Sequence, residues 1–316
     1  MEEKYLSVFI PIFNEEDNIS RLYSELKLVL KDAGFSYEII FIDDSSVDSG
    51  YEIIKDIAKS DSNVKVIHFK RNYGQTAAMQ AGFEYSSGKI IISMDGDLQN
   101  NPEDIPKLIK KIDEGYDVVC GWRKNRRDKF ISRKIPSFLA NKLISKITGL
   151  RLNDYGCTLR AYKNEAAKSI YLHGDMHRFI PAFAFWEGAS IAEVVVNHRE
   201  RIAGKSKYGI SRTYGVILDL LTIKFISDYS TKPSRIFGGP GLTLCLAGFL
   251  AAVSAIIKKI LFGVFIHRNP LMLLAVMLFL IGIFFILMGL LAEIIVRIYY
   301  KSQNKPIFHI KDAINF

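Results

Sequence analysis

The N-terminal part of the chain alternates short apolar runs with stretches in which apolar residues recur every three or four positions. Runs rich in β-branched residues predict buried strands, and the three-to-four spacing predicts amphipathic helices. The expected strands cover residues 6–13, 37–42, 64–69, 89–94 and 117–120, and the expected helices cover 15–30, a segment from 48 or 49, 77–85 and a segment from Pro102. Strands that alternate with helices predict an α/β fold with a doubly wound, mostly parallel sheet.

Polar residues follow three of these strands at the point where each strand ends. They are Asn14 and Glu15 after the first strand, Asp43 and Asp44 after the second, and Asp95 and Asp97 after the fourth. Because parallel strands end at one edge of a sheet, where ligands bind, we expect these residues to converge. Two carboxylates one residue apart repel each other unless a cation lies between them, and Mg²⁺ prefers oxygen ligands that it shares with substrate phosphates. The pattern predicts a metal–diphosphate site, although a single Asp-x-Asp pair is also typical of a polar turn.

Charge nearly disappears from residues 236–298. The runs 237–257 and 271–296 are each about long enough to cross a bilayer. The alternative is a helical hairpin buried inside a soluble domain. Two crossings leave both chain ends on one side, and the flanking basic residues favour the cytoplasmic side of the plasma membrane, although the connecting loop is basic too. We therefore expect a cytoplasmic domain in residues 1–230, a two-helix membrane domain in 236–298 and a cytoplasmic tail in 299–316.

Two further segments, 128–150 and 211–228, are assigned to the membrane interface. Residues 128–150 place apolar side chains at helical spacing, with Lys and Arg at the other positions, which is typical of a helix in the headgroup region. A helix packed on its own sheet has the same pattern, so both interpretations stay open. Gly239, Gly241 and Gly248 allow close helix packing, and a homo-oligomer is one arrangement that would use it.

The formal net charge is +9 and the mean hydropathy is +0.13, which is high for a purely soluble enzyme. Excess Lys and Arg suit anionic lipid or phosphorylated substrates. Nucleic acid is not expected as a partner, because the chain has no motif for its recognition. Three widely spaced cysteines form neither a disulfide framework nor a zinc motif. The dinucleotide fingerprint and the Walker loop are absent, and the acidic start argues against a signal peptide.

Several motifs occur in an order and spacing that is specific as a set. They are Val8-Phe9-Ile10-Pro11-Ile12-Phe13-Asn14-Glu15, Asp43-Asp44-Ser45-Ser46, Arg71-Asn72-Tyr73-Gly74, Asp95-Gly96-Asp97-Leu98-Gln99, Asp154-Tyr155-Gly156-Cys157-Thr158-Leu159-Arg160, and His198-Arg199 through Gly204-Lys205-Ser206-Lys207-Tyr208. Over about residues 4–230 the chain resembles the family 2 glycosyltransferases with the Rossmann-like GT-A fold. The later motifs resemble its polyprenyl-phosphate branch, which includes dolichyl-phosphate mannose synthases and bacterial undecaprenyl-phosphate glucosyltransferases. The Gln-x-x-Arg-Trp motif of processive synthases is absent, so we expect transfer of a single sugar.

The resemblance implies roles for the residues that match the family's motifs. Contacts with the nucleotide sugar are implied for Pro11, Asn14, Glu15, Asp43, Asp44 and Asp95, with Asp43 or Asp44 on the base or ribose. Asp95 and Asp97 would hold Mg²⁺ or Mn²⁺ on the diphosphate. Acceptor phosphate would bind Arg199, Arg201 and Lys205. The catalytic set is Asp97, Gln99 and Asp154, in which Gln99 lies in the sugar or acceptor pocket. Asp154 could orient the acceptor or act as a base, or it could instead pair with Arg160.

A lipid monophosphate is already ionised near neutral pH, so it needs positioning and charge neutralisation more than it needs a general base. Direct attack by this phosphate would invert the anomeric centre. We expect transfer of one sugar, with UDP-glucose as the first choice of donor, to undecaprenyl phosphate for cell-envelope glycosylation. One alternative is a GDP-mannose-dependent dolichyl- or polyprenyl-phosphate mannosyltransferase. The other is a non-catalytic, nucleotide-binding membrane scaffold.

Overall fold

The computed structural model describes residues 4–124, 135–172, 176–199, 234–262, 265, 269–301 and 308–316. The chain divides into two compact units, Met1–Leu220 with Pro306–Phe316, and Leu221–Lys305. The helix expected over 128–150 is described as α5 (Ile135–Thr148). The expected interface segment 211–228, and the site candidates Arg201 and Lys205, lie outside the described residues.

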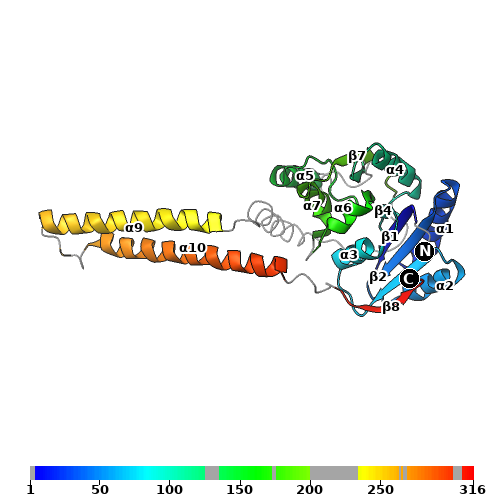
Figure 1. The fold of residues 1–316 in the computed structure, drawn as a ribbon, viewed down its shortest axis with the longest axis horizontal. Coiled ribbons are helices and arrows are strands. Elements are labelled where there is room, and N and C mark those ends of the chain that lie inside the picture. Colours follow the sequence, from blue (N-terminus) through cyan, green and yellow to red (C-terminus); the bar gives the residue numbers. More distant parts are fainter. Residues whose placement is uncertain are drawn as a thin grey trace. The chain divides into compact units, whose positions relative to one another are not determined.

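The first unit is built on one sheet with the strand order β7-β5-β6-β4-β1-β2-β3-β8 (Figure 1). The strands are β1 (Leu6–Ile12), β2 (Tyr37–Asp43), β3 (Val64–Phe69), β4 (Ile90–Ser93), β5 (Val118–Trp122), β6 (Arg160–Lys163), β7 (Ile191–Val195) and β8 (Ile310–Ile314). Parallel pairs join β1 to β2 and β4, β2 to β3, and β5 to β7, whereas β6 and β8 pair antiparallel with their neighbours. The mostly parallel α/β sheet is therefore confirmed, and β6, β7 and β8 are additions that the sequence pattern did not indicate.

Helices cover both faces of this sheet. The helices of the first unit, besides α5, are α1 (Glu16–Asp32), α2 (Gly50–Ser60), α3 (Gln75–Tyr85), α4 (Ile105–Asp113), α6 (Asn164–Ser169) and α7 (Ile180–Trp186), with short 3₁₀ turns η1 (Pro102–Asp104) and η3 (Met176–Phe179). Apolar residues of α1, α2 and α4 share one buried cluster with alternate residues of β1 and β2. On the other face, α3 packs on Phe9 of β1 through Phe83, with ring centroids 5.2 Å apart.

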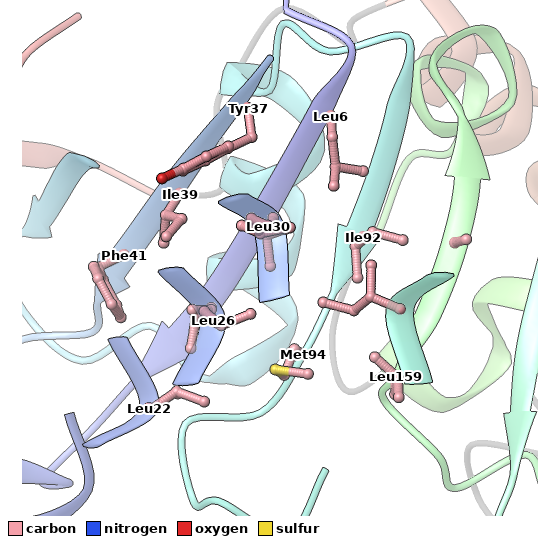
Figure 2. Close-up of a cluster of buried hydrophobic side chains, with 14 of the residues drawn as sticks. Leu6, Leu22, Leu26, Leu30, Tyr37, Ile39, Phe41, Ile92, Met94 and Leu159 are labelled. Atoms are coloured by element: carbon pink, nitrogen blue, oxygen red, sulfur yellow. The ribbon is translucent and has the colours of Figure 1, made fainter. Parts of the chain in front are cut away.

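The face under α1 shows why the periodic pattern produced these elements. Leu22, Leu26 and Leu30 recur at helical spacing and are almost completely buried. Figure 2 shows them packed over strand side chains such as Ile39 and Ile92. Complete burial of one such leucine stabilises a fold by about 1.5–3 kcal/mol, so this stripe fixes the helix on the sheet.

The last residues of the chain join this same sheet. Strand β8 pairs antiparallel with β3, with Asp312 opposite His68. Phe308 is buried and stacks on Phe69, with ring centroids 5.1 Å apart. Sequence analysis treated 299–316 as a separate tail, whereas the structure makes 310–314 an edge strand of the first unit. This pairing was not predictable, because β3 precedes β8 by more than 200 residues.

The second unit contains the helices α9 (Ser234–Phe262) and α10 (Pro270–Lys301). Its most apolar stretches, Phe237–Leu261 and Pro270–Ala292, are long enough to span a membrane, and only 17% and 11% of them is buried. These shares are far below those of a core helix in a soluble domain, which is mostly buried.

Glycines form the seam between α9 and α10. A Cβ on Gly241 would lie 2.8 Å from the carbonyl oxygen of Gly282, and one on Gly248 would lie 2.9 Å from that of Ala275. Gly239 has nothing within 4 Å of such an added atom. Gly241 and Gly248 therefore serve close packing within one chain, and neither requires an oligomer.

Gly82 lets α3 approach the sheet closely, since a Cβ there would lie 2.4 Å from the ring of Phe9. We expect Gly82→Ala to lower the free energy of unfolding of the first unit by about 1–3 kcal/mol, as overpacking of a tight core does. Urea denaturation of the purified protein measures this change. Glu84→Ala, an exposed site on the same helix, is the matched control and should stay within about 0.5 kcal/mol; equal effects would contradict the packing argument.

Candidate active site

Three loops follow β1, β2 and β4, which are neighbours in the sheet and run parallel. Each loop holds one non-glycine residue in the left-handed region, namely Asn14 with φ 54°, Ser45 with φ 61° and Leu98 with φ 60°. Such residues cost of order 1–3 kcal/mol each and cluster at functional sites. The strain therefore marks the same sheet edge that the polar residues mark.

Hydrogen bonds tie the first two loops together. The Asn14 backbone N–H donates to Ser46 Oγ over 3.0 Å, and Asn14 Oδ1 accepts from the Val47 N–H over 2.9 Å. Glu15 Oε2 accepts from Asn18 Nδ2 over 2.7 Å, at the start of α1. Pro11 lies within β1, opposite Ile42. Asn14 and Glu15, which are expected to contact the nucleotide, therefore also form hydrogen bonds within the protein.

The two carboxylates after β2 are buried and strongly hydrogen-bonded. Asp43 Oδ2 lies 2.6 Å from His68 Nδ1, and Asp44 accepts from the N–H groups of Tyr73 and Gly74 over 2.7 and 2.8 Å. Gly74 has φ 90°, a conformation that residues with a side chain avoid and glycine adopts readily. Burial raises the pKa of the Asp44 carboxyl, the two N–H groups oppose this shift, and Asp43 adds to it. The motif Arg71-Asn72-Tyr73-Gly74 thus supplies the backbone donors that hold Asp44.

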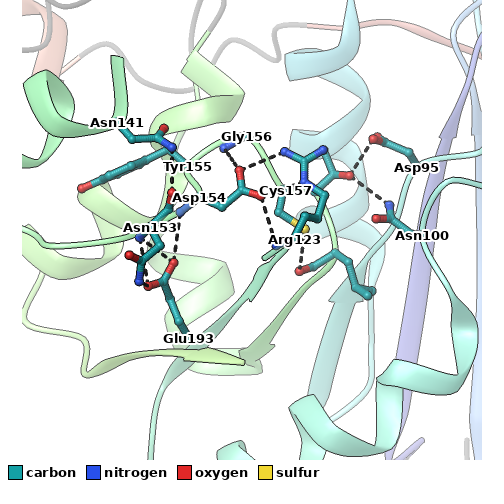
Figure 3. A network of polar contacts seen from close by, with 12 residues as sticks. Asp95, Asn100, Arg123, Asn141, Asn153, Asp154, Tyr155, Gly156, Cys157 and Glu193 are labelled. Carbon is teal, nitrogen blue, oxygen red and sulfur yellow. Dashed lines mark hydrogen bonds and ion pairs between the residues drawn. The ribbon is translucent and has the colours of Figure 1, made fainter. Parts of the chain in front are cut away.

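Asp95 and Asp97 follow β4 and form the centre of the candidate site. Asp95 accepts from Gln75 Nε2 over 3.0 Å and from Thr158 Oγ1 over 2.6 Å. Thr158 Oγ1 also accepts from Asn100 Nδ2 over 3.1 Å (Figure 3). Burial, and then repulsion by Asp97, raise the pKa of Asp95 to about 6, although the Thr158 hydroxyl opposes the shift.

This pair fits a divalent cation. The pKa of Asp95 is raised first by burial and then by repulsion from Asp97, and a bound divalent cation would offset both effects. Among the residues that the structure describes, no group of three His, Cys, Asp or Glu side chains is placed to hold a metal. Asp95 and Asp97 would therefore share the ion with oxygen atoms of a bound ligand and of water, as Mg²⁺ commonly does.

Asp154 pairs with Arg123, and the suggested pair with Arg160 is wrong. Arg123 Nε and Nη2 donate to the two Asp154 oxygens over 2.7 and 2.9 Å, in a fork that Figure 3 shows. Arg160 is buried and donates instead to the carbonyl oxygens of Tyr155 and His177. Glu193 on β7 accepts from the backbone N–H groups of residues 153 and 154. The Asp154 loop is thereby fixed from both sides.

Arg123 lies beside the acidic pair but was not among the site residues expected from the sequence. Its charge lies close enough to Asp95 to lower the pKa of that carboxyl. Gly156 leaves room for it, since a Cβ there would lie 3.0 Å from Arg123 Nη2. The available signal was position alone, because Arg123 directly follows the last residue of β5. The arrangement places a cation held by Asp154 beside the acidic pair.

Arg199 lies next to the Gln99 loop, as a phosphate ligand of the site would. Its N–H donates to the Gln99 carbonyl oxygen over 2.9 Å, and Gln99 N–H donates in turn to Asp97 Oδ1 over 3.2 Å. The Arg199 guanidinium donates to Glu25 over 2.5 Å and to Asn101 over 2.7 Å. A phosphate would therefore share this guanidinium with Glu25 or displace that carboxylate, and the acceptor role of Arg199 stays a prediction.

These features define a class of protein. An open α/β sheet that gathers polar residues at three adjacent strand ends, with buried carboxylates after β2 and β4 and an Asp-x-Asp pair suited to a metal, is typical of a nucleotide-sugar glycosyltransferase of the GT-A type. Residues 7–171 match the family model described as glycosyl transferase family 2.

Two relatives extend this match along almost the whole chain. The dodecaprenyl-phosphate galacturonate synthase of Rhizobium johnstonii is 40% identical, over 98% of this chain and 93% of the relative. The undecaprenyl-phosphate 4-deoxy-4-formamido-L-arabinose transferase of Shewanella sediminis is 38% identical, over 98% of this chain and 92% of the relative. The chain belongs to glycosyltransferase family 2.

Solved structures share the fold. Glucosyl-3-phosphoglycerate synthase from Mycobacterium tuberculosis, in complex with Mn²⁺, UDP and phosphoglyceric acid, superposes with a TM-score of 0.55. It is 18% identical and covers 72% of this chain and 81% of its own. The same enzyme with Mn²⁺, UDP-glucose and phosphoglyceric acid gives a TM-score of 0.54 at 19% identity, over 72% and 82% of the two chains. The likeness confirms the expected GT-A fold.

Thr158 allows a direct test of the carboxylate pair. Thr158→Val keeps the shape of the side chain but removes the hydroxyl that donates to Asp95, so we expect the dissociation constant for Mn²⁺ to rise about 10-fold or more. Electron paramagnetic resonance of free Mn²⁺, titrated in the presence of UDP, measures this constant. Thr158→Ser retains the hydroxyl and should bind Mn²⁺ like the wild type. Equal affinities of the Val and Ser variants would disprove the role of this hydrogen bond.

Proposed function

We propose that the chain transfers a single sugar from a nucleotide sugar to a polyprenyl monophosphate, with inversion at the anomeric carbon. The acidic pair Asp95 and Asp97 at the end of β4, in which burial and the neighbouring Asp97 raise the pKa of Asp95, is the observation that carries the proposal. The two relatives that align along nearly the whole chain are both named as polyprenyl-phosphate sugar enzymes, which supports this acceptor class.

The donor would lie along the carboxyl edge of β1, β2 and β4. Asp43 or Asp44 would contact the base or ribose, and Asp95 and Asp97 would face the diphosphate. A divalent cation on this pair, Mg²⁺ or Mn²⁺, would stabilise the charge that develops on the leaving nucleoside diphosphate. Gln99 would lie in the sugar or acceptor pocket, and its backbone joins the two groups beside it, since its N–H donates to Asp97 and its carbonyl oxygen accepts from the Arg199 N–H.

The acceptor phosphate would meet fixed cations. Because it is already ionised near neutral pH, the chain has to position it and offset its charge. Arg123 presents a planar guanidinium, a good partner for phosphate oxygens, and the carboxylate of Asp154 holds it in one orientation. We propose that Asp154 acts in this way, as a positioning residue for Arg123. Arg199, Arg201 and Lys205 would complete the phosphate site.

The sheet itself constrains how the chain crosses a membrane. Strands β1 to β7 precede α9 and β8 follows α10, yet β8 pairs with β3 in one sheet. The residues before and after the two helices must therefore lie on one side of any bilayer that the helices span. This supports two crossings with the catalytic unit and the C-terminus together, and the basic flanks favour the cytoplasmic face of the plasma membrane.

The membrane-surface role of 128–150 keeps some support. On α5, Leu143 is 46% exposed whereas Ile144 is buried. One side of the helix thus packs on protein and another leaves an apolar residue uncovered, as an interfacial helix would.

A donor screen tests the proposal. The full chain in detergent is assayed with undecaprenyl phosphate, Mn²⁺ or Mg²⁺, and the donors UDP-glucose, UDP-galacturonate, UDP-4-formamido-arabinose and GDP-mannose. UDP-glucose was the expectation from sequence, but the names of the two relatives favour a uronic acid or a formamido-pentose. We expect one donor to be preferred by at least about 10-fold, and NMR of the lipid product to show the opposite anomeric configuration, β from an α-linked donor.

Asp97→Ala is the control variant, and it should abolish transfer while the melting temperature stays near that of the wild type. Near-normal turnover of this variant would refute the role of the acidic pair. Retention of configuration would exclude direct displacement. No turnover with any donor would favour a nucleotide-binding scaffold, and a clear preference for GDP-mannose would favour the mannosyltransferase alternative.

The Asp154–Arg123 pair gives a second prediction. Asp154→Asn and Arg123→Lys both break the fork, so we expect each to lower kcat/KM for the acceptor about 10- to 100-fold, the scale of a lost charge-assisted hydrogen bond. The double variant should have the same kcat/KM as the less active single variant, because each change removes the same interaction. If Asp154 were the general base, the two reductions in kcat/KM would multiply in the double variant. That outcome would overturn the positioning role.

A further inference from the structure

The C-terminal segment, residues 308–316, is connected to the two carboxylates at the end of β2, Asp43 and Asp44. Each connection is indirect and runs through a separate series of side-chain contacts. This segment follows α10 in the sequence and contains β8. No side chain of the segment belongs to the acidic pair or to the phosphate cluster described above. Its contacts nevertheless lead toward Asp43 and Asp44, the residues proposed to meet the base or ribose of the donor.

The first chain of contacts runs through two aromatic rings. Asp312 Oδ2 accepts from the Tyr51 hydroxyl over 2.6 Å. The Tyr51 ring stacks on the His68 ring, with centroids 4.1 Å apart and an angle of 25° between the planes. His68 Nδ1 lies 2.6 Å from Asp43 Oδ2. In the tautomer with hydrogen on Nδ1, His68 donates this hydrogen bond to Asp43.

The second chain of contacts reaches Asp44. Phe308 stacks on Phe69, and His309 packs edge-on against Tyr73, with ring centroids 6.2 Å apart. Phe69 and Tyr73 also contact each other, at 5.7 Å and nearly perpendicular. The Tyr73 backbone N–H donates to Asp44. The segment thus supports both the ring that orients Asp43 and the loop that binds Asp44.

Asp43 and His68 depend on these contacts because both side chains are buried. Asp43 is fully buried and His68 is 6% exposed, so neither can exchange its partner for water without cost. Asp312 itself is exposed and lies on an edge strand, directly opposite His68. An exposed carboxylate has no packing role of its own there. Its hydrogen bond holds the Tyr51 ring flat against His68, and this ring in turn limits the orientations open to His68.

We infer that the C-terminal segment is a positioning part of the donor site, in which Asp312 acts through Tyr51 and His68 to orient Asp43. The inference rests on the proposed role of Asp43 and Asp44 at the nucleotide. Donor affinity then depends on residues that lie beyond the two apolar helices. Binding of the acceptor does not, since Arg123, Asp154 and Arg199 have no contact with this segment among the interactions described.

Two point variants test the inference without removing the strand. Tyr51→Phe keeps the ring but loses its hydroxyl, and Asp312→Ala loses the acceptor. For the full chain in detergent with Mn²⁺, we expect each to raise the dissociation constant for UDP three- to tenfold by calorimetry. Donor KM should rise in parallel, whereas kcat and acceptor KM change less than twofold. The double variant should match the single variants, because one hydrogen bond is lost in all three.

Controls separate positioning from general destabilisation. Asp312→Asn keeps an oxygen that accepts from Tyr51 and should restore wild-type affinity, and Lys311→Ala, on the same strand, should change nothing. Wild-type UDP affinity in Tyr51→Phe and Asp312→Ala would overturn the inference and leave the proposed function intact. Losses that follow the melting temperature and fall equally on donor and acceptor would also overturn it. If the wild type binds none of UDP, CDP, GDP and ADP, the proposed function fails, and this inference fails with it.

Discussion

Parallel pairing of β1 with β2 and β4 is the constraint from which the site follows. Strands that run in one direction end at one edge, so polar residues from distant parts of the sequence meet there. Asn14, Asp43 and Asp95 reach this edge from three different strands. The strained turns at Asn14, Ser45 and Leu98 show that the sheet, once formed, imposes conformations on these loops that the residues alone would avoid.

Charge is distributed unevenly around this edge. Buried carboxylates gather at the ends of β2 and β4, and a divalent cation would offset the negative charge of the pair that follows β4. Arg123 and Arg199 lie at the flanks of the acidic pair, each held by a carboxylate, Asp154 or Glu25. Such pairs keep the guanidinium groups oriented before a ligand arrives, and an oriented group stabilises developing charge better than a mobile one.

The C-terminal strand returns the chain to the sheet of the first unit after the two apolar helices. Because β8 pairs with β3, the chain returns to its catalytic sheet after α10. The same pairing restricts the membrane topology and supports the loops beside Asp43 and Asp44. One edge strand thus links the two apolar helices to the loops beside Asp43 and Asp44 through covalent continuity and a few aromatic contacts.

The sequence by itself determined the elements and the kind of chemistry. Alternating β-branched and helical runs defined β1 to β5 and their helices, the apolar runs defined α9 and α10, and carboxylates at strand ends marked the site, because all of these are local patterns. Only the tertiary structure decided which partners meet. Arg123 rather than Arg160 binds Asp154, β8 rather than solvent covers the edge of β3, and Gly241 packs on Gly282 of the same chain. Each of these contacts joins residues far apart in sequence, so its existence depends on the strand order and the packing of whole elements, which no local pattern encodes.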